Sequence, residues 1–123
     1  MSTLFPKPDM LTMAIVGPVL DEIVSEQPDT IIASLGCKYA SNYRPSCLVG
    51  HMLYRLGWTS EELHNLDSAD TDGSGTGIET LVDYGYIDAD STTTRFLTVL
   101  QDYQDAQNRW EDALSIARGR VAQ

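Results

Sequence analysis

The sequence predicts a mainly α-helical single domain of about five to six helices. Apolar residues recur at three- and four-residue spacing in several separate stretches, which is the period of an α-helix. Hydroxyl residues, amides and glycines stand at the ends of these stretches, as they do at helix caps. A content of 42% hydrophobic and 21% charged residues is typical of a folded globular chain. The sequence also allows a short β-hairpin from Cys37 to Tyr43, because β-branched and aromatic residues gather there before the turn residue Pro45.

The chain is expected to form one folded unit after a short lead. Its 123 residues are the length of one ordinary domain, and neither an internal repeat nor a Pro/Gly/Ser-rich linker divides it. The first eight residues contain Pro6 and Pro8, so residues 1–8 are expected to be a loosely ordered lead. The helical domain is then expected to span residues 9–123.

The first helix is predicted from Asp9 to Glu26. Pro18 lies inside it and lacks the N–H that would bond to the carbonyl of Ala14. With Gly17 beside it, this proline predicts a kink or a break. The apolar stripe of the helix consists of Leu11, Ile15, Val16, Val19, Leu20, Ile23 and Val24.

Two further helices are predicted in the middle of the chain. Ser46 can cap the first of them and Gly57 can end it. Thr59 and Glu62 form a capping box that opens a brief second helix, through about Leu66. The apolar residues of the first are Leu48, Val49, Met52, Leu53 and Leu56.

A short helix and a longer one are predicted next. Thr76 and Glu79 form a second capping box, which starts a short helix at Gly77 that Gly85 ends. A helix then begins near Ser91, just after Asp88 and Asp90, which are expected at a turn and a cap. Its inward residues are expected to be Phe96, Leu97, Leu100 and Tyr103.

The last helix is predicted after a break near Asn108. Asn108 and Glu111 repeat the capping-box pattern, and Arg118 and Arg120 suit the negative end of the helix dipole. Its apolar stripe is expected to be Trp110, Ala113, Leu114, Ala117 and Val121.

The charge of the chain is strongly negative and unevenly distributed. Eighteen acidic residues against eight basic ones give −10, and residues 57–94 contain nine acids and no Lys or Arg. Such a stretch repels phosphate, so direct binding to nucleic acid or to an anionic membrane is disfavoured. A basic protein partner is compatible with it, and solubility alone is the other explanation.

The chain is expected in the cytoplasm. Its two cysteines, Cys37 and Cys47, are too few to form the disulfide framework of a small secreted protein, and they are expected to be reduced thiols. The apolar stretch "MLTMAIVGPVL" is too short to span a bilayer, and Asp9 precedes it. No small-residue cleavage site of a signal peptide follows it.

Residues 70–81, "DTDGSGTGIETL", begin like a calcium-binding loop. Asp70, Asp72 and Ser74 stand where the first three ligands would be, and Gly75 stands at the turn position. The twelfth position, which should be a bidentate Glu, is Leu81. We therefore expect a helix start here and no calcium site.

Cysteine and histidine suggest two further kinds of site. Cys47 and His51 lie four residues apart on one helical face, and Cys37 and His64 could complete a zinc set. The spacing does not fit, because structural zinc usually draws on closely spaced cysteine pairs. We expect no metal and no cofactor. A thiol at a helix start can have a lowered pKa, so a thiol-dependent enzyme using Cys47 is kept as an alternative.

The aromatic residues near predicted helix ends have two interpretations. Trp58 follows Gly57, the glycine that ends the helix predicted after Ser46, and Tyr84, Tyr86 and Tyr103 lie in the C-terminal half. Such residues anchor interfaces, and they also close the edge of a core. The sequence leaves both interpretations open. No phosphate-binding loop, nucleophile elbow or other catalytic motif is present, so a non-enzymatic protein is expected.

Two segments, "YRPSCLVGHMLYRLGW" and "LQDYQDAQNRWEDAL", carry a resemblance to a known group. They resemble small accessory proteins of bacteriophages that infect actinobacteria, and similar open reading frames of the hosts. That group has a "CLVGH"-like helix start and a "QD-x-G-x-x-W" run before a final helix, and the similarity covers about residues 33–117. In this chain Gln107 replaces the glycine of the run. The matching positions are Cys47, Gly50, Leu53, Gly57, Gln104, Asp105 and Trp110.

The resemblance implies a phage-encoded protein that acts in the host cytoplasm by binding host proteins and perturbing host physiology. It implies no catalytic residue. Together with the acidic stretch, it predicts a monomer or homodimer that binds a host protein. An acidic DNA mimic that inhibits a nucleic-acid-binding protein is the alternative from another class. The residues predicted to contact the partner are Trp58, Glu61, Glu62, Asp67, Asp70, Asp72, Tyr84 and Tyr86.

Overall fold

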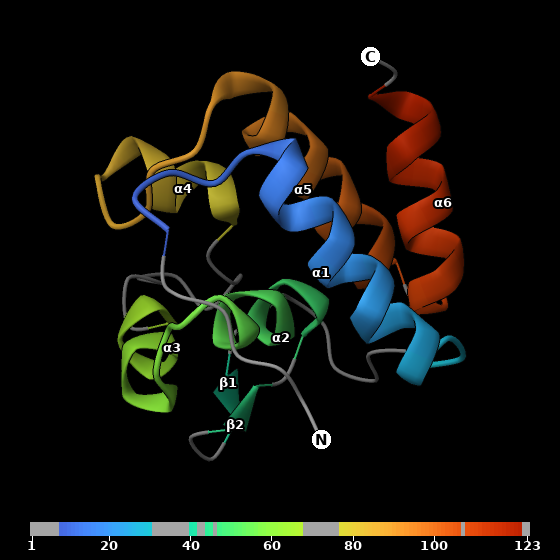
Figure 1. The fold of residues 1–123 in the computed structure, drawn as a ribbon, viewed down its shortest axis with the longest axis horizontal. Coiled ribbons are helices and arrows are strands. Elements are labelled where there is room, and N and C mark those ends of the chain that lie inside the picture. Colours follow the sequence, from blue (N-terminus) through green and yellow to red (C-terminus); the bar gives the residue numbers. More distant parts are fainter. Residues whose placement is uncertain are drawn as a thin grey trace.

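Six helices and one pair of two-residue strands form the described part of this computed structural model (Figure 1). The structure describes residues 8–30, 40–41, 44–45, 47–67, 77–106 and 108–121. The predicted mainly α-helical fold is confirmed. In chain order the elements are α1 (Met13–Glu26), β1 (Ala40–Ser41), β2 (Arg44–Pro45), α2 (Leu48–Arg55), α3 (Ser60–Asp67), α4 (Ile78–Asp83), α5 (Ser91–Asp105) and α6 (Trp110–Arg120).

The two strands pair antiparallel, with Ala40 opposite Pro45 and Ser41 opposite Arg44. The predicted hairpin at residues 37–43 overlaps this ladder only at β1, because the second strand begins at Arg44. Positions 37–39 and 42–43 lie outside the described residues, as does the predicted lead except for Pro8.

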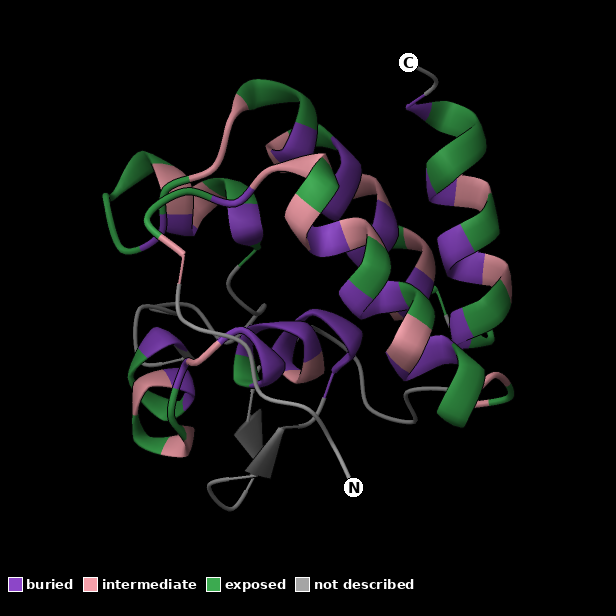
Figure 2. Cartoon of the chain, viewed as in Figure 1, coloured by how far each residue is buried: buried purple, intermediate pink, exposed green. Residues whose placement is uncertain are grey.

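Helix α5 lies at the centre of the packing. It contacts α2, α4 and α6, while α1 packs against α2 and α6. In Figure 1, α5 and α6 run side by side in opposite directions, and α4 lies at the other side of α5. Each of these helices turns its apolar face inward, so the buried residues in Figure 2 face one another across the helices. Burial of this shared apolar core stabilises the fold.

Helix α1 differs from its prediction in its first residue and in its continuity at Pro18. It begins at Met13 with Thr12 as its N-cap, later than the predicted start at Asp9. Of the kink or break predicted at Pro18, the break is wrong, since the helix continues from Met13 to Glu26. Pro18 is on the exposed side, and buried apolar residues on both sides of it hold the two halves on one core. Tertiary packing therefore overrides the local cost of the proline.

The residues before α1 are fixed by a backbone bridge. The Leu11 N–H donates to the Asp88 carbonyl at 2.8 Å, and the Asp90 N–H donates to the Leu11 carbonyl at 3.3 Å. Leu11 itself is fully buried. These bonds attach the start of the described chain to the connection between α4 and α5. No helix in the described ranges has the length and apolar character that crossing a bilayer requires.

Both predicted glycine helix ends are confirmed. Gly57 has φ 102° and Gly85 has φ 78°, in the left-handed region that favours glycine. After α4, the Gly85 N–H donates to the Val82 carbonyl at 3.1 Å and the Tyr86 N–H to the Leu81 carbonyl at 2.9 Å. The equivalent bonds end α2, where the Gly57 N–H donates to the Tyr54 carbonyl and the Trp58 N–H donates to the Leu53 carbonyl. This double pattern is the Schellman motif.

The predicted helix starts are confirmed at α3 and α5. The Glu62 N–H donates to the Thr59 hydroxyl at 3.1 Å, and the Thr59 N–H donates to the Glu62 carboxylate at 3.0 Å. This reciprocal pair is the predicted capping box. At α5, the Asp90 carboxylate accepts from the Thr93 N–H at 2.8 Å. That hydrogen bond lowers the pKa of Asp90, because it stabilises the ionised form.

The predicted caps of α2, α4 and α6 are wrong. Cys47 caps α2 where Ser46 was predicted, and Gly77 and Arg109 cap α4 and α6 without a side-chain hydrogen bond. The Asn108 amide donates instead to the Tyr103 carbonyl, at 2.7 Å. Ser46 and Thr76 themselves lie outside the described residues.

Two buried glutamines of α5 take over part of the missing capping. The Gln104 Oε1 atom accepts the first helical N–H of α2, from Leu48, at 2.6 Å. The Gln101 Oε1 atom accepts the first helical N–H of α4, from Ile78, at 2.8 Å. Adjacent turns of α5 thus satisfy the starts of two other helices. The first N–H groups of α6, from Trp110 and Glu111, donate to backbone carbonyls of the segment after α1.

Candidate functional site

The structure separates the residues predicted to contact a partner into three groups. Trp58 is in the core with 6% of its surface exposed, so the structure supports core closure for this residue and not an exposed anchor. Glu61 is exposed on α3, and Glu62 is partly buried in the capping box. The other exposed members are Tyr84 and Tyr86. The side chain of Asp67, and all of Asp70 and Asp72, lie outside what the structure describes.

Tyr84 and Tyr86 form an exposed aromatic pair at the end of α4. They are 69% and 57% exposed, and their ring centroids are 6.4 Å apart at 78° in an edge-to-face arrangement. Gly85 between them adopts the positive φ of the helix end. The Schellman turn therefore fixes the backbone from which both rings project.

Tyr103 has a different environment. It is partly buried against the core, and the Arg120 guanidinium carbon lies 5.5 Å from its ring centroid. This is a cation–π contact between α5 and α6. Tyr103 therefore contributes to helix packing, and it does not belong to the exposed aromatic pair.

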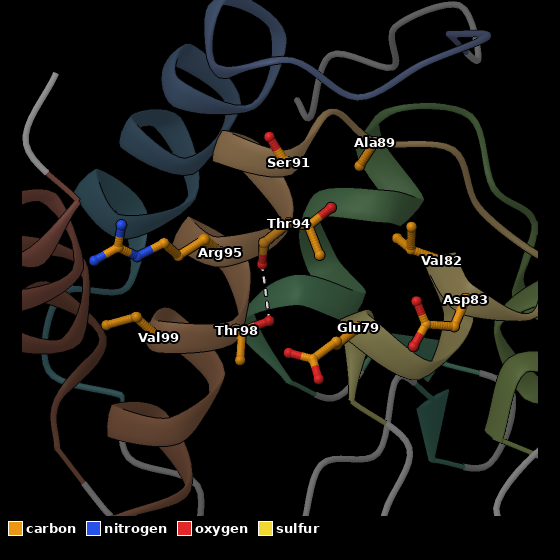
Figure 3. Close-up of a pocket in the computed structure, with 9 residues that line it drawn as sticks. All are labelled: Glu79, Val82, Asp83, Ala89, Ser91, Thr94, Arg95, Thr98 and Val99. Atoms are coloured by element: carbon orange, nitrogen blue, oxygen red, sulfur yellow. Dashed lines mark hydrogen bonds between the residues drawn. The ribbon is translucent and has the colours of Figure 1, made fainter.

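A groove of about 450 Å³ lies between α4 and α5 (Figure 3). Asp83 in its lining directly precedes Tyr84 in the chain. Its α4 wall carries two carboxylates and its α5 wall carries mostly hydroxyl groups. Figure 3 shows the Glu79 side chain pointing across the groove toward Thr98, and the Arg95 side chain pointing away from both carboxylates. The lining residues are Glu79, Val82, Asp83, Ala89, Ser91, Thr94, Arg95, Thr98 and Val99.

The two threonine hydroxyl groups of the α5 wall already donate their hydrogens to the backbone. The Thr94 hydroxyl donates to the Asp90 carbonyl at 2.9 Å, and the Thr98 hydroxyl donates to the Thr94 carbonyl at 2.8 Å. Their oxygens keep lone pairs for a ligand. Together with the carboxylates of Glu79 and Asp83, they line the groove with hydrogen-bond acceptors.

Three acids in and beside α1 and α6 are paired with arginines. Arg118 binds Asp21 at 2.7 Å, and Arg109 binds Asp29 at 2.9 Å and Asp112 at 3.0 Å. These exposed pairs contribute little stability each. Their effect is to remove negative potential from this side of the molecule.

The exposed acids on the other side have no such partners. Among the residues that the structure describes, Glu61, Glu79, Asp83 and Asp88 form no ion pair. All four are exposed and belong to the 57–94 stretch. Unpaired exposed acids are thus frequent among the described residues of α3, α4 and the connection after α4, while Asp102 and Glu111 are further unpaired acids on α5 and α6. We call Glu61, Glu79, Asp83 and Asp88, with Tyr84 and Tyr86, the acidic face.

Arg55 of α2 is a buried cation that holds α1. Only 5% of it is exposed. It binds Glu26 at 2.5 Å and also binds Glu22, both on α1. The hydrogen bond to Arg55 lowers the pKa of Glu26, because it stabilises the ionised carboxylate. This network is structural, because it faces the α1–α2 contact.

Cys47 and His51 do lie on one face of α2, but they are part of the packing. Cys47 is 1% exposed, and its Sγ atom accepts the Gly50 N–H at 3.3 Å. His51 is partly buried, with its ring centroid 5.3 Å from that of Trp110. A substrate has no direct access to the Cys47 thiol in this arrangement, so the geometry gives no support to the alternative of a thiol-dependent enzyme.

The pKa of His51 is lowered, first by burial and then by the charge of Arg55, while Glu26 acts in the opposite direction. The unfolded chain therefore binds more protons than the folded one once the pH falls below about 6.5. Stability from this group is complete above that pH and is lost on acidification. We expect His51→Gln to flatten the fall in urea-unfolding free energy between about pH 7 and pH 5. A fall in unfolding free energy that is as steep in His51→Gln as in the wild type would contradict the assignment.

No three His, Cys, Asp or Glu side chains in the described ranges gather closely enough to hold a metal ion. His64 lies on α3, on a different helix from Cys47. Cys37 and most of the predicted helix-start segment at 70–81 lie outside those ranges, so the structure describes neither candidate site in full.

The groove between α4 and α5 was not predicted from the sequence. Finding it requires knowing that α4 packs on α5, which local patterns do not specify. One sequence signal was available. Glu79 and Asp83 are four residues apart on a short helix, a spacing at which two like charges repel and lower helix stability.

In comparisons with known proteins, the chain matches no protein-family model, no curated protein and no solved structure. The site is therefore interpreted from its own geometry and charge.

Proposed function

We propose that this protein is a non-enzymatic phage accessory protein that binds a basic protein of the host cytoplasm through its acidic face. The observation that carries the proposal is the segregation of charge. Arginines pair with three acids in and beside α1 and α6, although Glu111 of α6 stays unpaired within the described ranges. By contrast, every described exposed acid of α3, α4 and the following connection lacks an ion pair with another described residue.

An unpaired acidic surface suits association with a positively charged partner. It speeds the encounter by long-range attraction and disfavours partners of like charge. Tyr84 and Tyr86 add exposed aromatic area at a fixed position, and aromatic residues are the usual anchors of interfaces. Charge would then select the partner, and the tyrosines would hold it.

The experiment is capture from lysate of an actinobacterial host. Glu61→Lys combined with Asp88→Lys should reduce the amount of captured partner by about tenfold or more, because it reverses two charges of the acidic face. Asp102→Lys combined with Glu111→Lys makes the same change in net charge on exposed positions outside that face. This control should stay within about twofold of the wild type.

Circular dichroism melts establish that both variants are folded. Equal capture by the wild type and both variants would contradict the proposal. Competition by duplex DNA for the captured partner would instead favour the DNA-mimic alternative, in which the carboxylates occupy a nucleic-acid site.

A further inference from the structure

We infer that the groove between α4 and α5 is the slot for a single lysine or arginine side chain of the partner, presented on a linear basic segment. This inference rests on the proposed function and gives it a specific contact. The groove volume of about 450 Å³ is ample for one long side chain and falls in the range of natural ligand sites.

Two features of the α4 wall favour a bound cation, although Glu79 itself lies in the first turn, where the helix dipole stabilises a negative charge. Glu79 and Asp83 stand at i and i+4 on α4, where two like charges repel each other. Asp83 is also the last residue of α4, at the negative end of the helix dipole, and the last turn has no basic residue. A bound cation would relieve both effects at once. Local costs of this kind are expected at binding sites, where stability is given up for function.

The other groups of the groove match a long cationic side chain. Val82 and Ala89 provide apolar surface for an aliphatic stem. The oxygens of Thr94 and Thr98 accept hydrogen bonds, since their own hydrogens are committed to backbone carbonyls. Ammonium and guanidinium groups are donors only, so they match the carboxylates of the α4 wall and the threonine oxygens of the α5 wall.

Arg95 fixes where the cation can lie. It lines the groove and forms no ion pair within the described residues. Its side chain points away from Glu79 and Asp83 in Figure 3. The partner's cation is therefore expected against the α4 wall.

The test is an NMR titration of the full chain with hexalysine, with hexaglutamate as the charge-reversed probe. Amide shifts should concentrate at residues 79–83 and 91–99, and hexaglutamate should produce none. Glu79→Gln combined with Asp83→Asn should weaken hexalysine binding at least about tenfold, since two contacting charges are lost. Its melting temperature should stay close to that of the wild type, because the loss of the repulsive pair offsets the loss of the favourable first-turn charge of Glu79.

Two further variants separate a specific slot from a general charge effect. Asp102→Asn with Glu111→Gln removes the same charge outside the groove and should stay within about twofold of the wild type. Thr98→Lys places a tethered cation beside Glu79 and should block the slot.

The outcomes distinguish this inference from the proposed function. Equal weakening by the two neutralised pairs, or shifts centred elsewhere, would overturn the groove and leave binding by the acidic face intact. Hexalysine binding that is absent while host capture still depends on Glu61 and Asp88 would do the same. If neither hexalysine nor a host protein is bound, the proposed function fails as well.

Discussion

Replacing Trp110 with alanine is expected to lower the free energy of unfolding by about 3–5 kcal/mol. Trp110 is 1% exposed and is among the largest fully buried side chains that the structure describes. Its backbone N–H donates to the Thr30 carbonyl at 2.9 Å, and its ring contacts His51 of α2 edge-on. Truncation therefore leaves a large cavity where α6, α2 and the segment after α1 meet.

Urea unfolding followed by circular dichroism measures this loss. Tyr84→Ala is the matched aromatic control, because the ring of Tyr84 is 69% exposed. Its effect should be within about 0.5 kcal/mol. In host capture, Tyr84→Ala should directly reduce the amount of captured partner. Trp110→Ala should reduce it only through the loss of folded protein. A loss below about 1 kcal/mol for Trp110→Ala would show that the core does not depend on this ring.

The stripe that contains Trp110 was predictable because it is local. Spacing of three and four identifies the inward residues of a helix whatever it packs against, and the stripe of α6 is buried as expected. Gly57 and Gly85 were predictable for a similar reason, since positive φ at a helix end strongly favours glycine. These features depend on near neighbours in the chain.

The features that were missed depend on distant residues. Pro18 should break an isolated helix, yet the packing of α1 on α2 and α6 keeps it continuous. Asn108 resembled a cap, but its amide bonds to the Tyr103 carbonyl while the N–H of Trp110 reaches Thr30. Capping patterns state what a residue can do locally. Tertiary contacts decide which of several partners it finds.

The candidate site likewise combines features that the sequence shows with features that depend on tertiary packing. Its negative charge and its tyrosines are visible in the sequence, and Tyr84 and Tyr86 are exposed in the structure. Trp58 was equally prominent in the sequence but lies in the core. The groove itself depends on the packing of α4 against α5, and so only the repulsive spacing of Glu79 and Asp83 could have indicated it.

Replacing Gln104 with methionine is expected to lower the free energy of unfolding by about 2 kcal/mol, the cost of a buried donor without a partner. Gln104 is fully buried. Its Oε1 atom accepts the Leu48 N–H at 2.6 Å, and its Nε2 atom donates to Asp105 at 3.0 Å, which orients the amide. Methionine has nearly the same length and shape but offers the Leu48 N–H no comparable acceptor.

The same substitution at Gln101 should cost somewhat less, because its partner Ile78 follows the exposed Gly77, where water can compensate the open N–H. Arg95→Met, at an exposed position of the same helix, is the control and should change stability by at most about 0.5 kcal/mol. Urea unfolding gives the totals, and hydrogen exchange identifies the helix affected. Gln104→Met should speed exchange in the first turn of α2, and Gln101→Met in the first turn of α4. Exchange that rises equally in both helices would show that the glutamines act on global stability and not as caps supplied by α5.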